Sequence, residues 1–296
     1  MRYLVLDVGG SSIKHALADE RYHLTAPGRV PAARFTTHAE FIDVIGALYD
    51  AAAPVDGIAI STAGELDPAT GYMFTGGAHL FNAGTNIVAA VQARCGGVPV
   101  AAENDANCAL LAEVYDGVLV GRRNAVALVL GTGVGGAVMI NGRIYHGSHF
   151  FSGNASLSRV DLRHPTEGPF AMFNGVGALL ADYANRVDAP RVEVDGPLFF
   201  ARLADGDSDA EAALEAYCER LGAFIFNWHV LLDVEAFAVG GGISAQPQVV
   251  ETLRRHVTAI FDSALFQVPR PEVHACRHGN DANLLGALHH FLTSRN

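Results

Sequence analysis

Short apolar runs alternate with glycine-containing turns and with amphipathic segments along most of the chain. The runs at 3–6, 55–61, 98–102, 125–130 and 237–239 have the length and composition of buried strands. Segments with helical spacing lie between several of these runs. The pattern therefore predicts a protein of the α/β class.

Amphipathic spacing and capping signals predict the helices. Thr37 and Glu40 form a capping box ahead of the apolar face at 41–48, and Ser208 and Glu211 form a second box. The irregular stretch at 146–168 is expected to be a long loop. The predicted helices cover 41–48, 85–94 with Thr85 as its cap, 105–113, 208–232, 248–261 and 281–291.

The order strand, glycine turn, strand occurs twice in the sequence. Residues 3–18 show it first, and residues 125–140 repeat it about 120 residues later, which indicates two related domains. We expect an N-terminal domain at 1–118, completed by the C-terminal helix at 281–296, and a second domain at 119–280.

The glycines at 131–136 satisfy the pattern G-x-G-x-x-G, which in a dinucleotide-binding protein is followed at once by a helix. Here a strand pattern at 137–140 and the hairpin signal Asn141-Gly142 follow instead. This order disfavours a dinucleotide-dependent oxidoreductase. The chain also has no G-x-x-x-x-G-K-[ST] sequence, which excludes a P-loop.

The charge balance limits the partners of the protein. The chain has 296 residues, of which 50% are hydrophobic, and a formal net charge of -11. This apolar content excludes disorder, and the acidic balance disfavours nucleic acid and anionic membranes as partners. A phosphate group would therefore be bound locally, by backbone amides, a few cations or a metal.

The cysteine spacing indicates reduced thiols. Cys95, Cys108, Cys218 and Cys276 lie far apart and form no C-x-x-C pair, which disfavours a disulfide scaffold or a four-cysteine zinc site. The first residues enter a strand pattern without the layout of a signal peptide. We therefore expect a cytoplasmic protein.

Three glycine-containing turns, at 9–12, 131–136 and 240–244, are candidates for contacts with phosphates. Backbone amides that carry no side chain can approach a phosphate closely, and Ser11, Ser12 and Thr132 would add hydroxyl groups. One such turn alone is better explained as a tight hairpin. Three of them in separate parts of the chain favour a nucleotide site.

Two aspartates are candidates for the chemistry. Asp7 ends the first strand, where it can cap turn amides or hold Mg²⁺ beside phosphates, directly or through water. Lys14 can neutralise phosphate charge, but an ordinary exposed strand lysine is the favoured interpretation. Asp105 stands before a helix, where it can be an N-cap or the base that accepts a hydroxyl proton during phosphoryl transfer. The pattern leaves both roles of Asp105 open.

Five segments occur in an order that resembles one protein family: Asp7–Lys14, Glu103–Asn107, Leu130–Gly136, Gly240–Ser244 and His278–Ala287. With these motifs the chain resembles the ROK (repressor, ORF, kinase) family of bacterial sugar kinases. The resemblance extends over essentially the whole chain and is therefore specific for family and fold.

The resemblance implies the actin-like ATPase fold, in which two RNase-H-like α/β domains surround a central cleft for ATP and sugar. It implies that Asp105 is the general base, that Gly64, Asn104 and Asn154 lie at the sugar, and that the protein is a homodimer. The positions implied for ATP and Mg²⁺ are Asp7, Gly9, Gly10, Ser11, Ser12, Lys14, Thr132, Gly133, Gly135, Gly241 and Gly242.

The departures from the family pattern fall on the acceptor site. Typical members have G-E-I-G-H after the second hairpin, whereas residues 153–157 read G-N-A-S-L, with Asn154 in place of the Glu and Leu157 in place of the His. The cysteine-rich zinc motif is missing from 163–173, so we expect no zinc site, and His146-x-x-His149 is expected to be an ordinary loop sequence. Zinc-free members that act on glucosides or acylated hexosamines resemble this pattern.

The expected function is ATP-dependent phosphorylation of a hexose hydroxyl, with a glycoside or an N-acyl hexosamine favoured over glucose. The alternative is a non-catalytic protein of the same fold that senses a sugar or a nucleotide, which the altered acceptor segment favours. Asn104, Asp105 and the three glycine turns favour the kinase.

Overall fold

The structure is a computed structural model that describes residues 1–32, 35–161, 163–164, 166 and 168–294. The chain forms two compact units. Unit 1 comprises Met1–Gly117, His146–Ser152 and Asn280–Asn296, and unit 2 comprises Val118–Tyr145 and Gly153–Gly279. The segment His146–Ser152 therefore belongs to unit 1, whereas the predicted boundaries put it in the second domain. Positions 162, 165 and 167 of the predicted loop, and the last two residues of the predicted first domain, lie outside the described residues.

A mixed sheet forms the centre of unit 1. Its strands are β1 (Arg2–Val8), β2 (Ser12–Asp19), β3 (Leu24–Pro31), β4 (Gly57–Thr62) and β7 (Val100–Asn104). The strand order is β3-β2-β1-β4-β7, in which β1 pairs antiparallel with β2 and parallel with β4. The carboxyl ends of β1, β4 and β7 therefore lie at one edge of the sheet, which is where Asp7, Thr62 and Asn104 lie.

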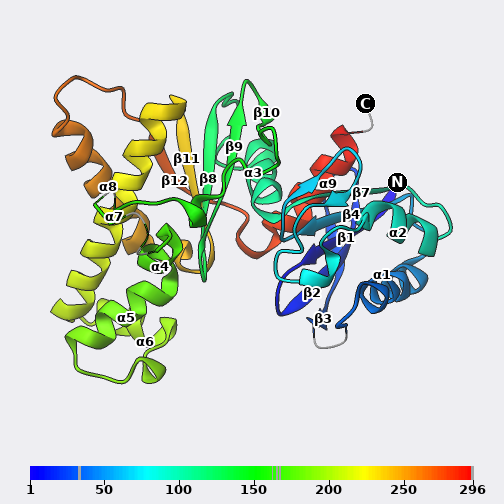
Figure 1. The fold of residues 1–296 in the computed structure, drawn as a ribbon, viewed down its shortest axis with the longest axis horizontal. Coiled ribbons are helices and arrows are strands. Elements are labelled where there is room, and N and C mark those ends of the chain that lie inside the picture. Colours follow the sequence, from blue (N-terminus) through cyan, green and yellow to red (C-terminus); the bar gives the residue numbers. More distant parts are fainter. Residues whose placement is uncertain (33–34, 162, 165, 167, 295–296) are drawn as a thin grey trace. The chain divides into compact units, whose positions relative to one another are not determined.

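Helices cover both faces of this sheet (Figure 1). They are α1 (His38–Ala52) and α2 (Ile87–Arg94) on one face, and α3 (Asp105–Asp116) and α9 (Ala282–Thr293) on the other. Alternate residues of β1 serve the two faces, since Leu6 packs in the core with Phe41 of α1, whereas Val5 packs in the core with Leu288 of α9. A small hairpin, β5 (Leu66–Asp67) and β6 (Tyr72–Met73), follows β4.

Unit 2 repeats the same sheet. Its strands are β8 (Ala125–Leu130), β9 (Val134–Ile140), β10 (Arg143–Ile144), β11 (Ala236–Gly240) and β12 (Glu272–Ala275), in the order β10-β9-β8-β11-β12. Two antiparallel pairings are followed by two parallel pairings in both units. The helices are α4 (Phe170–Asn174), α5 (Val176–Arg186), α6 (Gly196–Ala204), α7 (Ser208–Leu232) and α8 (Pro247–Asp262). The common strand order agrees with the repeat seen in the sequence.

The capping predictions are confirmed at one helix and wrong at two. The Thr37–Glu40 capping box is present at α1. At α2 the cap is Asn86, because the Thr85 hydroxyl donates to the Asn82 carbonyl instead. At α7 the cap is Asp207, whose carboxylate accepts two backbone N–H groups, so that Ser208 is the first helical residue.

Other elements differ from the sequence predictions. The segment at 131–136 leads into a strand and not a helix, as predicted, although β9 already begins at Val134. The strands β3 and β12 and the helices α4, α5 and α6 were not predicted. No helix among the described residues has the length and apolar character that a membrane span requires.

Candidate active site

The first glycine turn connects β1 to β2 in unit 1. The Gly9 N–H donates to the Ser12 carbonyl over 3.1 Å, and the buried His79 places its Nε2 3.1 Å from the Gly9 carbonyl. Neither Gly9 nor Gly10 has a positive φ, so a left-handed conformation is not the reason for glycine here. Gly10 and Ser11 are exposed. Contacts at Gly9 thus hold the turn, and its outer side, at Gly10 and Ser11, is open to solvent.

Asp7 lies beneath this turn and is 5% exposed. Its Oδ2 lies 3.2 Å from Lys14 Nζ, and its Oδ1 accepts a hydrogen bond from Asn283 Nδ2 over 2.9 Å. The Ser61 hydroxyl lies 3.5 Å from the same Oδ1. Lys14 is therefore ion-paired with Asp7, which differs from an ordinary exposed lysine and from a lysine that would contact only a bound phosphate.

Asn104 joins the end of β7 to the start of α3. Its Oδ1 accepts the N–H groups of Ala106 and Asn107, so Asn104 is the N-cap. Its Nδ2 donates to the Gly64 carbonyl over 3.1 Å. Gly64 has a φ of +101°, and a Cβ there would lie 2.7 Å from the Thr75 carbonyl oxygen, so close packing and conformation both require glycine. The structure thus brings two predicted sugar-binding positions into direct contact.

Asp105 is the first residue of α3 and is partly buried. Burial has the largest effect and raises the pKa of Asp105 to about 6. The hydrogen bond from the Ala106 N–H, next in size, lowers this pKa, and the negative charges of Asp7 and Glu65 raise it. Because Asn104 caps the helix, the N-cap explanation of Asp105 is wrong. A carboxylate whose ionised form is destabilised has greater affinity for a proton.

The buried carboxylate of Glu103 lies next to this pair. Its Oε1 accepts the Asn104 N–H over 2.7 Å and Asn107 Nδ2 over 3.0 Å. Its Oε2 accepts a hydrogen bond from His146 Nε2 over 2.8 Å. Burial by itself would raise the pKa of Glu103, but the hydrogen bond and charge of His146 hold this pKa below its usual value. No local pattern in the sequence predicts this contact, because 43 residues separate its partners.

The second glycine turn lies in unit 2, between β8 and β9. The Gly131 N–H donates to the Gly133 carbonyl over 2.9 Å, and Thr132 is exposed. An added Cβ at Gly131 would meet nothing within 4 Å, so internal packing does not demand glycine there. Gly241, at the end of β11, has a φ of +95° and lies so close to the Leu130 backbone that a side chain is excluded.

The segment that carries Asn154 lies against this turn. The Ser156 hydroxyl accepts the Val134 N–H over 2.9 Å and lies 3.0 Å from the Val134 carbonyl. A short 3-10 turn, Ala155–Leu157, begins directly after the half-buried Asn154. Leu157 is 57% exposed. The two positions that depart from the family pattern are thus held next to the β8–β9 turn.

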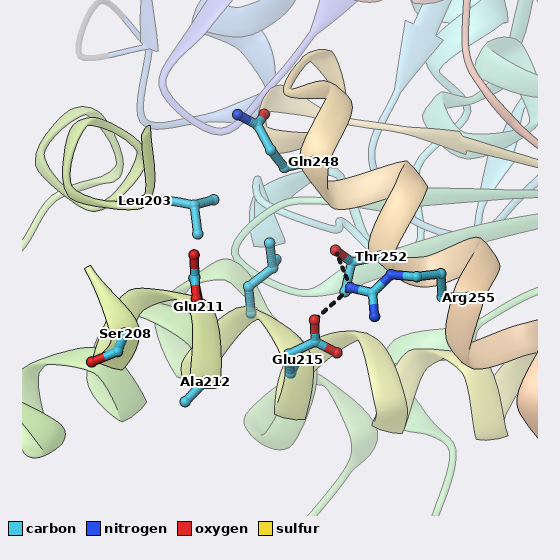
Figure 2. Close-up of a pocket in the computed structure, with 9 residues that line it drawn as sticks. Leu203, Ser208, Glu211, Ala212, Glu215, Gln248, Thr252 and Arg255 are labelled. Carbon is cyan, nitrogen blue, oxygen red and sulfur yellow. Dashed lines mark hydrogen bonds and ion pairs between the residues drawn. The ribbon is translucent and has the colours of Figure 1, made fainter. Parts of the chain in front are cut away.

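The predicted residues form one group in each unit. The group in unit 1 comprises Asp7, Gly9, Gly10, Ser11, Ser12, Lys14, Gly64, Asn104 and Asp105, and the group in unit 2 comprises Thr132, Gly133, Gly135, Asn154, Gly241 and Gly242. Figure 2 shows a different feature, a cavity of about 560 Å³ within unit 2 that includes Glu211, Glu215 and Arg255 in its lining. None of the predicted residues lines this cavity.

Among the described residues, no group of three or more His, Cys, Asp or Glu side chains is arranged to hold a metal ion. Of the H-x-x-H pair, His146 is hydrogen-bonded to Glu103, while His149 is exposed. Asp7 is a single buried carboxylate, which suits a hard cation that takes its other ligands from water and phosphates.

Comparison with known proteins gives concordant matches. A model of the ROK family matches residues 3–293. A β-glucoside kinase from Klebsiella pneumoniae is 29% identical over 98% of this chain and 96% of its own length. A β-glucoside kinase from Listeria monocytogenes is 31% identical over 82% of this chain and 81% of its own. The solved structure of a ROK family protein from Streptococcus pneumoniae in complex with sucrose matches with a TM-score of 0.88 and 25% identity, over 100% of this chain and 99% of that one.

Proposed function

The chain belongs to the ROK family, and we propose that it transfers a phosphoryl group from ATP to a hydroxyl of a hexose derivative, with a glycoside as the favoured acceptor. It has the actin-like ATPase fold of that family, and a relative that matches along nearly the whole chain is a β-glucoside kinase. The protein is accordingly an enzyme of the sugar kinase class.

The observation that carries the proposal is the position and state of Asp105. This carboxylate begins α3 beside the Asn104 cap, and its pKa of about 6 leaves it ionised at neutral pH, with more affinity for a proton than an ordinary aspartate. In the proposed reaction Asp105 orients the acceptor hydroxyl and accepts its proton as the oxygen attacks phosphorus. Correct positioning of the hydroxyl supplies a large part of the rate enhancement.

The glycine turns are assigned to ATP. In unit 1 the exposed Gly10 and Ser11 present the turn to the phosphates. Gly9, whose N–H already donates to the Ser12 carbonyl, and the buried Ser12 hold the turn in shape. In unit 2, Thr132, Gly133 and Gly135 form the second phosphate-binding turn, and Gly241 and Gly242 contact the adenosine. Asp7 would hold Mg²⁺, directly or through water. The positive charge of Lys14 would partly offset the negative charge of Asp7. The metal neutralises phosphate charge during transfer.

The acceptor is assigned to Gly64, Asn104 and Asn154. Asn104 is pre-oriented, because its amide already bridges α3 and the Gly64 carbonyl. Asn154 carries no charge, and Leu157 carries no hydrogen-bonding group, so the site suits a sugar whose substituent replaces a free hydroxyl. β-Glucosides are such sugars, and β-glucoside kinases are among the relatives.

An ADP-release screen over a panel of sugars tests the proposal. The wild-type protein with ATP and Mg²⁺ is expected to release ADP with a β-glucoside such as cellobiose, and not without an acceptor. The Asp105→Asn variant serves as the control for contaminating kinases. Sugar binding without ADP release from any acceptor would favour the sensor instead, for which the altered residues Asn154 and Leu157 are the argument.

A further inference from the structure

A buried hydrogen-bond relay connects the segment His146–Ser152 to the strand that leads into α3. The Glu103 carboxylate is 1% exposed and would be costly to bury without partners. His146 Nε2 donates to its Oε2 over 2.8 Å. His290 of α9 places Nδ1 3.8 Å from the same oxygen, and burial lowers the pKa of His290, which favours its neutral form. Of these two histidines only His146 lies within hydrogen-bond distance of Glu103, so its hydrogen bond is the main support of Oε2.

The second oxygen of Glu103 acts on the candidate active site. Oε1 accepts the backbone N–H of Asn104 and the side-chain amide of Asn107, which lies one helical turn along α3. These two bonds fix the backbone where β7 becomes α3. Asp105 is the next residue, so its direction depends on how firmly Glu103 is held.

The segment that supplies His146 is also anchored by an aromatic contact. The ring of Phe150 stacks on Phe74 at a centroid separation of 5.1 Å, and the His146 ring lies 6.2 Å from Phe150. These contacts keep His146 against unit 1. The charged and titratable groups around the His146 ring are Glu103, Asp67 and His290.

We propose that His146 is a positioning residue that, through Glu103, holds Asn104 and Asp105 in the orientation needed for phosphoryl transfer. The inference rests on the proposed kinase function. It adds a role for the segment His146–Ser152, which the sequence marked only as a loop. His146 does not touch the reacting atoms in this scheme, and its loss should lower kcat while leaving the KM for ATP unchanged.

Two substitutions with the same functional group and different reach provide the test. In His146→Gln, the amide nitrogen occupies the place of Nε2 and can still donate to Glu103. In His146→Asn the amide is too short to reach. We expect kcat within about threefold of wild type for H146Q and about 10- to 100-fold lower for H146N, since small displacements of a catalytic group cost rates of that order. His149→Ala, at an exposed position of the same segment, is the matched control and should behave as wild type.

A second readout does not depend on activity. Backbone amide exchange in a peptide covering 100–116 should be faster in H146N than in H146Q, because the Asn104 N–H loses a firmly held acceptor. Equal kcat for H146N and H146Q, or a change in the KM for ATP as large as that in kcat, would overturn the inference. Absence of turnover in the wild type would refute the proposed function alone, and the exchange comparison would still decide whether His146 orders the start of α3.

Discussion

Asn283 Nδ2 donates to Asp7 Oδ1 over 2.9 Å and so joins the helix α9 to the strand β1 across 276 residues of sequence. The other oxygen of Asp7 lies 3.2 Å from Lys14. The carboxylate that we assign to Mg²⁺ is therefore fixed from two sides by neighbours that the strand alone does not supply. Residues that orient a metal ligand are expected to affect metal affinity nearly as strongly as the ligand itself.

Asn283→Ala should weaken the response to Mg²⁺. Without the amide, Asp7 is free to turn toward Lys14, and we expect the Mg²⁺ concentration for half-maximal activity to rise about 10-fold. Titration of Mg²⁺ at fixed ATP measures this. Asn280→Ala, at an exposed position just before α9, is the control. The same Mg²⁺ dependence in both variants would remove Asn283 from this role.

Asp105→Asn should nearly abolish turnover while ATP and sugar still bind. The amide preserves the shape and the contact with the Ala106 N–H but cannot accept the hydroxyl proton. Steady-state kinetics with calorimetric binding as the control would test both parts. A variant that retains a tenth or more of the wild-type kcat would exclude Asp105 as the base.

The pKa of Asp105 also predicts a pH dependence. As a base Asp105 must be ionised, so kcat/KM of the wild type should fall as the pH drops through about 6.

The contribution of Asp105 to the free energy of unfolding should show the opposite trend with pH. A carboxyl whose pKa is raised on folding stabilises the native state only while protonated, so this contribution is lost as the pH rises from about 4 to 6. The neutral Asn variant should therefore be more stable than wild type at pH 8, by ~1–3 kcal/mol.

Urea unfolding of both proteins at pH 4 and pH 8 measures that difference. The gain of Asp105→Asn should be small at pH 4, where wild-type Asp105 is protonated, and full at pH 8. A gain that does not change with pH would show that the charge of Asp105 is not the cause.

Local signals in the sequence were sufficient for much of the fold and for part of the candidate site. The Thr37–Glu40 capping box and the strands around the glycine turns were predictable because each depends on residues close in sequence. Where two capping residues stand side by side, as Thr85 and Asn86 do, tertiary hydrogen bonds decide between them. The pattern does not contain that information.

The supports of the candidate site were not predictable for a related reason. Asp7 lies near the end of β1, Asp105 directly follows β7, and both were found from motifs. Asn283 is separated from Asp7 by 276 residues of sequence. His146 acts on Asp105 through Glu103, from which it is separated by 43 residues. Pairings of this kind arise only when the sheet brings the segments together.

The metal content is a separate prediction. Purified protein should contain no stoichiometric zinc, because the cysteine-rich motif is missing from 163–173, while activity should require Mg²⁺ with ATP. Elemental analysis after dialysis and activity assays with and without chelator measure the two parts. One tightly held zinc per chain would contradict the first part.

The choice of acceptor is the most specific prediction. Asn154 stands where typical family members have a charged Glu, and Leu157, which is 57% exposed, stands where they have His. Loss of a charged hydrogen bond to a sugar hydroxyl costs ~1.5–3 kcal/mol, which corresponds to a factor of about 10 or more in kcat/KM for plain glucose. A substituted sugar without that free hydroxyl would not form this hydrogen bond in any case, so its kcat/KM is not lowered by the change.

We therefore expect kcat/KM to be about 10-fold or more higher for a β-glucoside or an N-acyl hexosamine than for glucose. Parallel kinetics on cellobiose, N-acetylglucosamine, N-acetylmannosamine and glucose measure the order. Asn154→Glu should shift the preference toward glucose, because a carboxylate accepts hydroxyl hydrogen bonds that the amide accepts less strongly. Ser156 should not be altered in these variants, since its hydroxyl holds the segment to Val134. A clear preference of the wild type for glucose would mean that neighbouring residues supply the missing contacts and that Asn154 and Leu157 do not select the acceptor.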